Sequence, residues 1–188
     1  MTRAKITLLI GGVRAGKSRK ALELAHARSG RGGVLFVATA QALDEEMRAR
    51  IDAHRRERPV DWVTLECPLD VADDLKRALS GSSRYSVVII DCLTLWVSNV
   101  LLSQPDDADV EAIVGARTRE LLDVLESFVT ANDGTAIIVT NEVGLGVVPA
   151  TQLGRRYRDA LGRANQIAAA AADEVTLMVA GLSMSLKA

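Results

Sequence analysis

Aromatic residues are scarce in this chain of 188 residues, which has only two Trp, two Tyr and two Phe. Proteins that bind single-stranded nucleic acids stack bases on such rings, beside a basic groove. The formal net charge of -1 provides no basic surface either. The composition therefore argues against a nucleic-acid partner. A small anionic ligand, which requires only a local positive site, remains compatible with it.

Cysteine and long apolar runs are also rare. Cys67 and Cys92 lie far apart and form no C-x-x-C pair, so we expect free, buried thiols and neither a zinc site nor a redox pair. No apolar run approaches the roughly 18 residues of a membrane span, and the N-terminus lacks the pattern of a signal peptide. We therefore expect a cytoplasmic protein without a membrane span.

The composition is that of an ordinary folded protein, with 48% apolar and 25% charged residues. A chain of this length can bury roughly 70% of its unfolded surface in one core. We expect a single domain over residues 1–188.

A glycine-rich segment at 11–18, GGVRAGKS, fits the pattern G-x-x-x-x-G-K-[ST] and follows the apolar run 6–10. In such a phosphate-binding loop, backbone N–H groups converge on phosphate oxygens, the lysine reaches the β- and γ-phosphates, and the serine hydroxyl ligates Mg²⁺. A strand–turn–helix corner without a ligand is the alternative. The predicted phosphate-binding residues are Gly11, Gly12, Val13, Arg14, Ala15, Gly16, Lys17 and Ser18, with Lys17 also catalytic and Ser18 a metal ligand.

Short apolar runs alternate with segments of helical periodicity along the rest of the chain. This order predicts a three-layer α/β domain with a mainly parallel sheet and a short antiparallel strand at its C-terminal edge. The strands are expected at 6–10, 34–38, 62–66, 86–91, 135–140 and 174–180, with a terminal strand through residue 186. The helices are expected at 18–28, 44–58, 70–79, 94–102, 110–131 and 152–172.

The carboxyl edge of such a sheet is where ligands bind. The apolar strand 86–91 ends in Asp91, as in a Walker B strand, whose acid helps to hold the Mg²⁺ that bridges the phosphates. The alternative is an aspartate that only caps the next helix. Residues 38–40 follow a neighbouring strand and lie where a nucleotide could touch them.

His54 stands among Arg50, Arg55, Arg56 and Arg58 on the helix predicted at 44–58. A neutral imidazole can attack an α-phosphorus to form a phosphoramidate, and guanidinium groups can stabilise the charge. The same histidine also continues an apolar stripe of Leu43, Met47 and Ile51, which favours packing. The residues alone leave both roles open.

The GTP-switch signatures are missing, because neither D-x-x-G nor N-K-x-D follows the later strands. Several interpretations of the motifs remain. They are an enzyme that uses His54 as a nucleophile, a simple small-molecule kinase in which His54 only packs, a non-catalytic nucleotide sensor, and a motor or nucleic-acid ATPase, for which no basic or aromatic second surface is evident.

Taken together, segments 11–19, 38–41, 44–59, 140–149 and 169–175 resemble the bifunctional adenosylcobinamide kinase/adenosylcobinamide-phosphate guanylyltransferase family of cobalamin biosynthesis. The resemblance covers nearly the whole chain and implies a P-loop NTPase-type, RecA-like fold. It also implies two reactions: ATP or GTP phosphorylates adenosylcobinamide, and GTP then gives its GMP to the histidine matching His54, which passes it on to form adenosylcobinamide-GDP.

The same resemblance implies the remaining site residues and a homotrimer. Glu66 and Asp91 would contact the nucleotide or its Mg²⁺. The other implied nucleotide contacts are Ala38, Thr39, Ala40, Arg55, Arg56, Glu57 and Arg58. Where some relatives have a second histidine before the catalytic one, this chain has Ala53, and some relatives carry glutamate in place of Asp91. The segments at 93–103 and 141–149 are candidates for the corrinoid site by position at the sheet edge alone.

Overall fold

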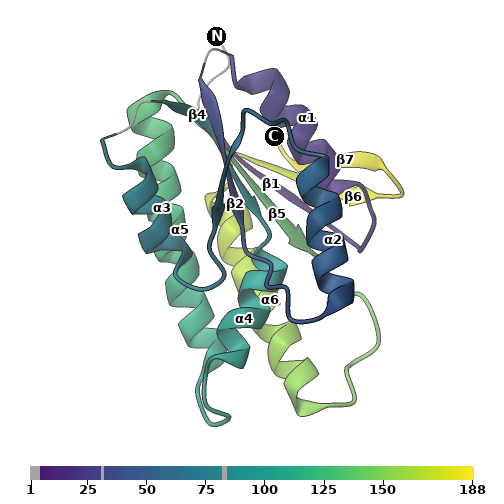
Figure 1. Cartoon of the computed structure of the whole chain (residues 1–188). Helices are drawn as coiled ribbons and strands as arrows, with labels where there is room; N and C mark the ends of the chain where they lie inside the picture. The colour runs from purple at the N-terminus through teal and green to yellow at the C-terminus, as the bar shows by residue number, and fades with distance from the viewer. Residues whose placement is uncertain (1–4, 31, 82–83) are drawn as a thin grey trace.

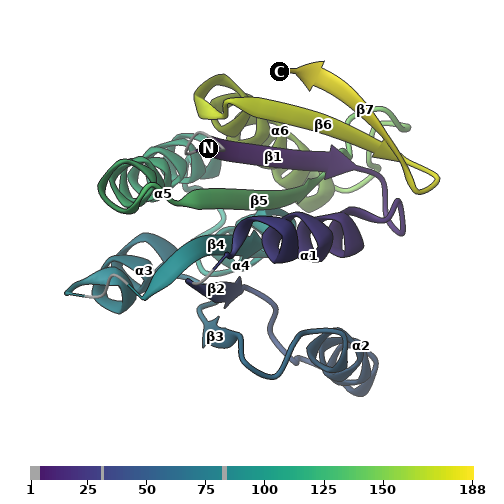
Figure 2. The same cartoon turned by 90° about the horizontal axis from the view of Figure 1, so that it is seen from above.

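The computed structural model describes residues 5–30, 32–81 and 84–188. The expected absence of a signal peptide rests partly on residues 1–4, which lie outside the described residues. All seven strands join one sheet (Figures 1 and 2). The strands are β1 (Lys5–Gly11), β2 (Gly33–Ala38), β3 (Val63–Glu66), β4 (Tyr85–Asp91), β5 (Thr135–Asn141), β6 (Glu174–Val179) and β7 (Leu182–Lys187). The helices are α1 (Lys17–Arg28), α2 (Glu45–Arg56), α3 (Val71–Leu79), α4 (Leu93–Leu102), α5 (Val110–Asn132) and α6 (Gln152–Ala171).

The sheet has the strand order β3-β2-β4-β5-β1-β6-β7. Every neighbouring pair is parallel except β6 and β7, which form an antiparallel hairpin at one edge. The β1 strand lies between β5 and β6, so the loop that follows it is near the middle of the carboxyl edge. The expected parallel sheet and antiparallel C-terminal strand are both present.

Helices cover the two faces of the sheet unequally. Helices α3, α4, α5 and α6 pack on one face in a large apolar core, and α1 covers the other face. Successive residues of β1 show why the strands are continuously apolar, because Leu8 faces the first core and Leu9 the second. Layers of helix, sheet and helix result (Figure 2).

Helix α2 differs from the others because none of its residues is buried. It stands away from the sheet, beyond the β3 edge (Figures 1 and 2). The helix is two residues shorter at its end than the predicted 44–58, and Asp44 caps its start by accepting a hydrogen bond from the Met47 N–H at 2.7 Å. Leu43 is 74% exposed, so the apolar stripe that favoured a packing role for His54 does not form a core contact at that position.

Among the described residues, no helix is both long and apolar enough to cross a membrane. Both cysteines are free, as expected. Cys67 is buried, whereas Cys92 is only partly so and lines the cavity described next.

Candidate functional site

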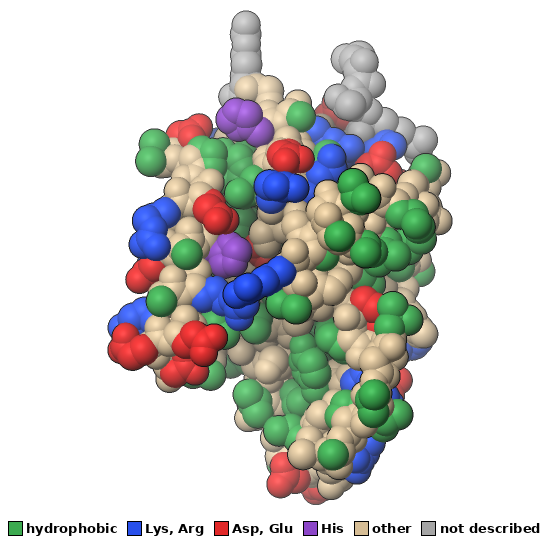
Figure 3. Space-filling view, turned by 90° about the vertical axis from the view of Figure 1, so that its right-hand side faces the viewer, with side chains coloured by type: hydrophobic (Ala, Val, Ile, Leu, Met, Phe, Trp, Pro, Cys, Tyr) green, Lys and Arg blue, Asp and Glu red, His purple; other side chains and the backbone are tan. Residues whose placement is uncertain are grey.

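A cavity of about 790 Å³ opens at the carboxyl edge of the sheet. Its walls come from the segment after β1, the ends of β2, β3, β4 and β5, and the inner side of α2. Figure 3 faces this side of the molecule and shows Lys and Arg side chains gathered around a histidine at the hollow. The lining contains seven Lys or Arg side chains (Arg14, Lys17, Arg19, Arg48, Arg50, Arg55 and Arg58) and four acidic ones (Asp52, Glu57, Glu66 and Asp91). The cavity is therefore locally positive in a protein whose net charge is -1.

The segment 11–18 has the form of a phosphate-binding loop. Gly16 adopts φ 93°, a conformation that suits glycine, and α1 begins at the next residue. The Lys17 ammonium donates hydrogen bonds to the carbonyls of Gly11 and Gly12 at 2.9 and 2.7 Å. Burial lowers the pKa of Lys17, while Cys92 and Asp91 oppose that shift. The lysine is thus held inside the loop, at the N-terminus of the helix, where anions are stabilised.

The C-terminal hairpin supports this loop from behind. Gly11 pairs with Met178 of β6, and a Cβ at Gly11 would lie 2.2 Å from the Met178 carbonyl oxygen. Gly181, in the β6–β7 turn, donates its N–H to the Ala15 carbonyl at 3.1 Å. A Cβ at Gly16 would be 3.4 Å from the Cα of Gly181. The loop therefore keeps its shape through backbone contacts with a segment more than 150 residues further along the chain.

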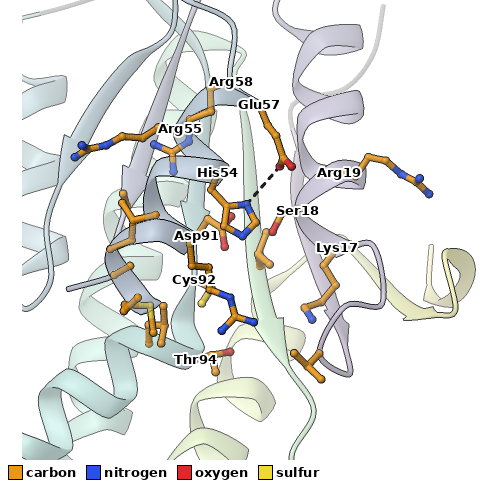
Figure 4. A pocket seen from close by; sticks show the side chains of 18 of the residues that line it. Lys17, Ser18, Arg19, His54, Arg55, Glu57, Arg58, Asp91, Cys92 and Thr94 are labelled. Atoms are coloured by element: carbon orange, nitrogen blue, oxygen red, sulfur yellow. Dashed lines mark ion pairs between the residues drawn. The ribbon is translucent and has the colours of Figure 1, made fainter. Parts of the chain in front are cut away.

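Asp91 ends β4 and faces the loop. Its carboxylate lies near the Ser18 hydroxyl (Figure 4). Burial raises the pKa of Asp91, and the nearby Ser18 hydroxyl and the positive charges of Arg58 and Lys17 oppose the rise. A carboxylate in this environment is stabilised by any further cation that comes near it.

A hydroxyl and one carboxylate form only part of a metal shell. Mg²⁺ typically takes one or two carboxylates and completes its octahedron with water and substrate phosphates, so Ser18 and Asp91 fit that ion. No group of three or more His, Cys, Asp or Glu that could hold a metal ion occurs within 5–30, 32–81 and 84–188. The Glu66 carboxylate pairs with the Arg55 guanidinium, and its role as a metal ligand stays a prediction.

Behind Asp91, Thr39 fixes the wall of the cavity. Its hydroxyl accepts a hydrogen bond from the Cys92 N–H at 2.9 Å and donates one to the Cys92 carbonyl at 2.7 Å. Asn99 of α4 donates in turn to the Thr39 carbonyl at 2.8 Å. Thr39 is 0% exposed and does not line the cavity. In this structure the Thr39 hydroxyl contacts the backbone of the residue after Asp91, and its contact with a nucleotide stays a prediction.

Helix α2 places His54 over the cavity (Figure 4). The ring lies between Glu57, whose Oε2 is 3.4 Å from Nδ1, and Asp91 (Figure 4). Two arginines connect this segment with the sheet. Arg55 pairs with Glu66, and the Arg58 guanidinium lies 3.7 Å from the centre of the Phe36 ring. Burial lowers the pKa of Arg58, which Asp91 opposes.

Most of the predicted site residues meet at this cavity. Those that line it are Val13, Arg14, Ala15, Gly16, Lys17, Ser18, Ala38, Ala40, His54, Arg55, Glu57, Arg58, Glu66 and Asp91. Gly11, Gly12, Thr39 and Arg56 do not line it. The lining also includes Arg50, Cys92 and Thr94. The sequence showed Arg50 beside His54, four residues earlier on the same helix, and Thr94 within the candidate corrinoid segment 93–103. It gave no signal that Cys92 would line the cavity.

A family model described as "Cobinamide kinase / cobinamide phosphate guanyltransferase" matches residues 7–186. The bifunctional adenosylcobalamin biosynthesis protein CobP of Pseudomonas aeruginosa is 45% identical over 180 residues, which cover 96% of each chain. The corresponding CobU proteins of Escherichia coli and Salmonella typhimurium are 40% and 38% identical, over 96% of this chain and 98% of theirs.

Solved structures resemble the fold at much lower identity. The flagellar accessory protein FlaH from Methanocaldococcus jannaschii superposes with a TM-score of 0.56 at 14% identity, over 98% of this chain and 79% of its own. The RadB recombinase has a TM-score of 0.52 at 13% identity, over 93% of this chain and 74% of its own. These likenesses confirm the expected P-loop NTPase-type fold.

Proposed function

This chain belongs to the cobinamide kinase/cobinamide phosphate guanyltransferase family, and we propose that its one nucleotide pocket serves both of the reactions in that description. The chain is a bifunctional transferase of adenosylcobalamin biosynthesis, whose substrates are cobinamides. The observation that supports a shared pocket is the position of His54, which lines the same cavity as the phosphate-binding loop. A γ-phosphoryl group and an α-phosphorus can therefore react within one site, in a single domain over residues 1–188.

A nucleoside triphosphate, GTP or ATP, would lie with its phosphates in the loop 11–18. The Lys17 ammonium would exchange its bonds with the Gly11 and Gly12 carbonyls for phosphate oxygens. Ser18 and Asp91 would hold Mg²⁺, which neutralises phosphate charge when bound. Ala38, Ala40, Arg55, Arg58 and Glu66 lie around the rest of the cavity and would contact the nucleoside. Thr39 and Arg56, outside the lining, would act at most indirectly.

In the kinase reaction, the hydroxyl of the aminopropanol arm of adenosylcobinamide attacks the γ-phosphorus. The bond between this phosphorus and the oxygen bridging to the β-phosphate breaks, the hydroxyl proton is lost, and the nucleoside diphosphate leaves. Lys17 stabilises the charge on the transferred group. The reaction needs positioning and positive charge rather than a covalent intermediate, and the lining supplies both.

In the guanylyl transfer, His54 is the nucleophile. A ring nitrogen of His54 bonds to the α-phosphorus of GTP, the bond to the β-phosphate oxygen breaks, and pyrophosphate leaves. A phosphate oxygen of adenosylcobinamide phosphate then attacks the same phosphorus and releases the histidine. Arg55 and Arg58, on either side of the helix end, would stabilise the charge that develops on the phosphate.

The corrinoid would approach from the exposed loop after β5. Leu145, Val147 and Val148 of this loop are exposed and offer apolar surface. Of the other candidate segment, 93–103, six residues of α4 are buried, and Thr94 and Leu95 line the cavity. We also expect self-association, as a trimer by resemblance, and sedimentation of the purified protein would measure it.

Labelling with GTP tests the covalent step. Incubation with α-labelled GTP should leave acid-labile, base-stable label on the chain, and His54→Ala should abolish it. His26→Ala is the matched control, because His26 lies exposed on α1 away from the cavity and should leave both labelling and kinase activity unchanged. Label that persists in His54→Ala would contradict the nucleophile. Kinase activity without any covalent label would favour a simple kinase, and binding without turnover would favour a nucleotide sensor.

A further inference from the structure

Glu57 directly follows α2 and holds one edge of the His54 ring. Its Oε2 lies 3.4 Å from Nδ1, and Figure 4 shows the contact on the side of the ring turned away from Asp91. The geometry points to Glu57 as a positioning residue that keeps the proton of His54 on Nδ1, so that Nε2 takes the guanylyl group. This inference rests on the proposed role of His54 as the nucleophile.

The chemistry of imidazole requires such a choice. A neutral ring has one N–H and one lone pair, and the partner of the N–H decides which nitrogen is free to react. A carboxylate accepts hydrogen bonds and donates none when it is ionised, so Glu57 favours the proton on Nδ1. The lone pair is then on Nε2, on the opposite side of the ring, toward the wall that carries Asp91 and Ser18 (Figure 4).

The same carboxylate would stabilise the product of the first step. When Nε2 bonds to the α-phosphorus and pyrophosphate leaves, Nδ1 keeps its proton and the ring becomes positively charged. The Glu57 carboxylate then faces a cation at Nδ1. When the acceptor phosphate attacks, the N–P bond breaks, its electron pair returns to Nε2, and the ring is neutral again. No proton has to enter or leave the ring in either step.

Two other charged groups lie near His54. Asp91 stands on the wall beside Ser18, and Arg55 pairs with Glu66. The side chains of His54 and Glu57 are 46% and 60% exposed, and ion pairs of that exposure add little to the free energy of unfolding. Removing Glu57 should therefore affect the rate of guanylylation rather than stability.

The helix provides a matched control. Glu45 pairs with Arg48 across the same spacing of three residues, at 3.8 Å, and Glu45 does not line the cavity. The variants to compare are Glu57→Ala, Glu57→Gln and Glu45→Ala. Glutamine keeps an oxygen that can accept a hydrogen bond from the Nδ1–H group but loses the charge.

Two measurements test the inference. The guanylylated protein is digested, and the ¹H–³¹P correlations of its GMP-histidine identify the bonded nitrogen. We expect Nε2 in the unaltered protein. In single-turnover labelling with α-labelled GTP, Glu57→Ala should lower the rate constant on the order of tenfold, much more than it changes the KM for GTP, as the loss of a residue that orients a reacting imidazole does. The rate constant of Glu57→Gln should lie between those of Glu57→Ala and the unaltered protein. The rate constant of Glu45→Ala should equal that of the unaltered protein.

Several results would overturn the inference. A bond at Nδ1 in the unaltered protein would do so while leaving His54 as the nucleophile. An unchanged rate constant in Glu57→Ala, or a change confined to the KM for GTP, would make Glu57 a surface residue or a nucleotide contact. Label that survives in His54→Ala, or no label at all, would contradict the proposed covalent step itself, and the role of Glu57 with it.

Discussion

At the scale of single residues, Asp91 is destabilising in the free protein. Burial raises its pKa, so the folded state holds the proton more strongly than the unfolded chain does. The stabilisation linked to that proton is complete below the unfolded pKa and is lost as the pH rises through the folded pKa. Wherever the pH is high enough to ionise Asp91 in the folded protein, the carboxylate therefore lowers the free energy of unfolding until a cation binds beside it.

We expect Asp91→Asn to raise the Tm of the nucleotide-free protein by roughly 2–4 °C at pH 7, because an amide carries no charge to desolvate. The amide oxygen can still accept from Ser18. The increase in Tm on adding Mg²⁺ and GTP should shrink in this variant. Thermal unfolding with and without Mg·GTP measures both effects, and Asp107→Asn, on the exposed loop before α5, is the control. A lower Tm for the free Asp91→Asn protein would contradict this prediction.

Single residues of the site differed in how far the sequence revealed them. The segment 11–18 was found because its motif is local, and Asp91 because a carboxylate ended an apolar strand. The role of Thr39 was not predictable, since its hydroxyl bonds to a backbone 53 residues away. The pairing of Glu66 with Arg55 likewise joins a strand to a helix whose relative placement no local pattern specifies.

At the scale of elements, α2 depends on its own ends more than the other helices do. It buries no residue, so tertiary packing adds little to its stability. The hydrogen bond at the Asp44 cap therefore provides a large part of the stability of α2. Helix α5 has an equivalent cap, in which Asp109 accepts from the Ala112 N–H at 3.0 Å, but α5 is packed in the core.

We expect Asp44→Ala to weaken α2 by about 1 kcal/mol, which corresponds to roughly fivefold faster amide exchange across residues 45–56. The Tm should hardly change, because the sheet does not depend on α2. Guanylylation should slow, since His54 is carried by this helix. Asp109→Ala is the comparison. Because α5 is packed in the core, the loss of its cap should lower the Tm instead. Equal losses of Tm in the two variants would show that α2 is part of the main cooperative unit.

Every element was predicted from the sequence within a few residues, because apolar strands and helical periodicity are local patterns. The end of α2 was placed two residues too late, since Pro59 was taken as the stop, whereas the helix already ends at Arg56. The exposure of α2 was not predicted. A stripe such as Met47 and Ile51 indicates one apolar face but not whether the protein supplies a partner for it, and here that face lines the cavity.

At the scale of the whole molecule, an ionic cluster joins three distant parts of the chain at the end of the sheet opposite the site. Glu174 at the start of β6 pairs with Lys5 of β1 at 2.7 Å and with Arg28 of α1 at 3.1 Å. The Lys5 hydrogen bond, together with Arg28 and Thr7, lowers the pKa of Glu174 to about 2. The stability from this shift is present above the unfolded pKa, about 4.5, and is lost as the pH falls toward 2.

We expect Glu174→Gln to lower the free energy of unfolding by roughly 1–2 kcal/mol at pH 7, a range reduced for partial solvent exposure. The difference from the unaltered protein should shrink steadily between pH 4.5 and pH 2.5. Urea unfolding at several pH values measures it, with Glu126→Gln, an exposed position on α5, as the control. A difference that stays constant down to pH 2.5 would show that lost packing, not charge, is responsible.

The order of the strands was not predicted, although the fold class was. Alternation of strands and helices requires a parallel sheet, but it does not say that β1 lies between β5 and β6. That pairing joins residues more than 120 positions apart, and no local propensity encodes it. The meeting of the phosphate loop and Asp91 was expected because parallel strands share a carboxyl edge, whereas that of His54 with the nucleotide was expected only from the family resemblance.

The hairpin behind the phosphate loop has a consequence for genetics. Gly181 does not line the cavity, yet its N–H donates to the Ala15 carbonyl and its Cα lies against Gly16. A selection for mutants that cannot make the vitamin would therefore recover alleles at two sites more than 150 codons apart, with the same defect in nucleotide use. Second-site suppressors would connect them, because nucleotide binding would depend on the hairpin as well as on the eight-residue motif.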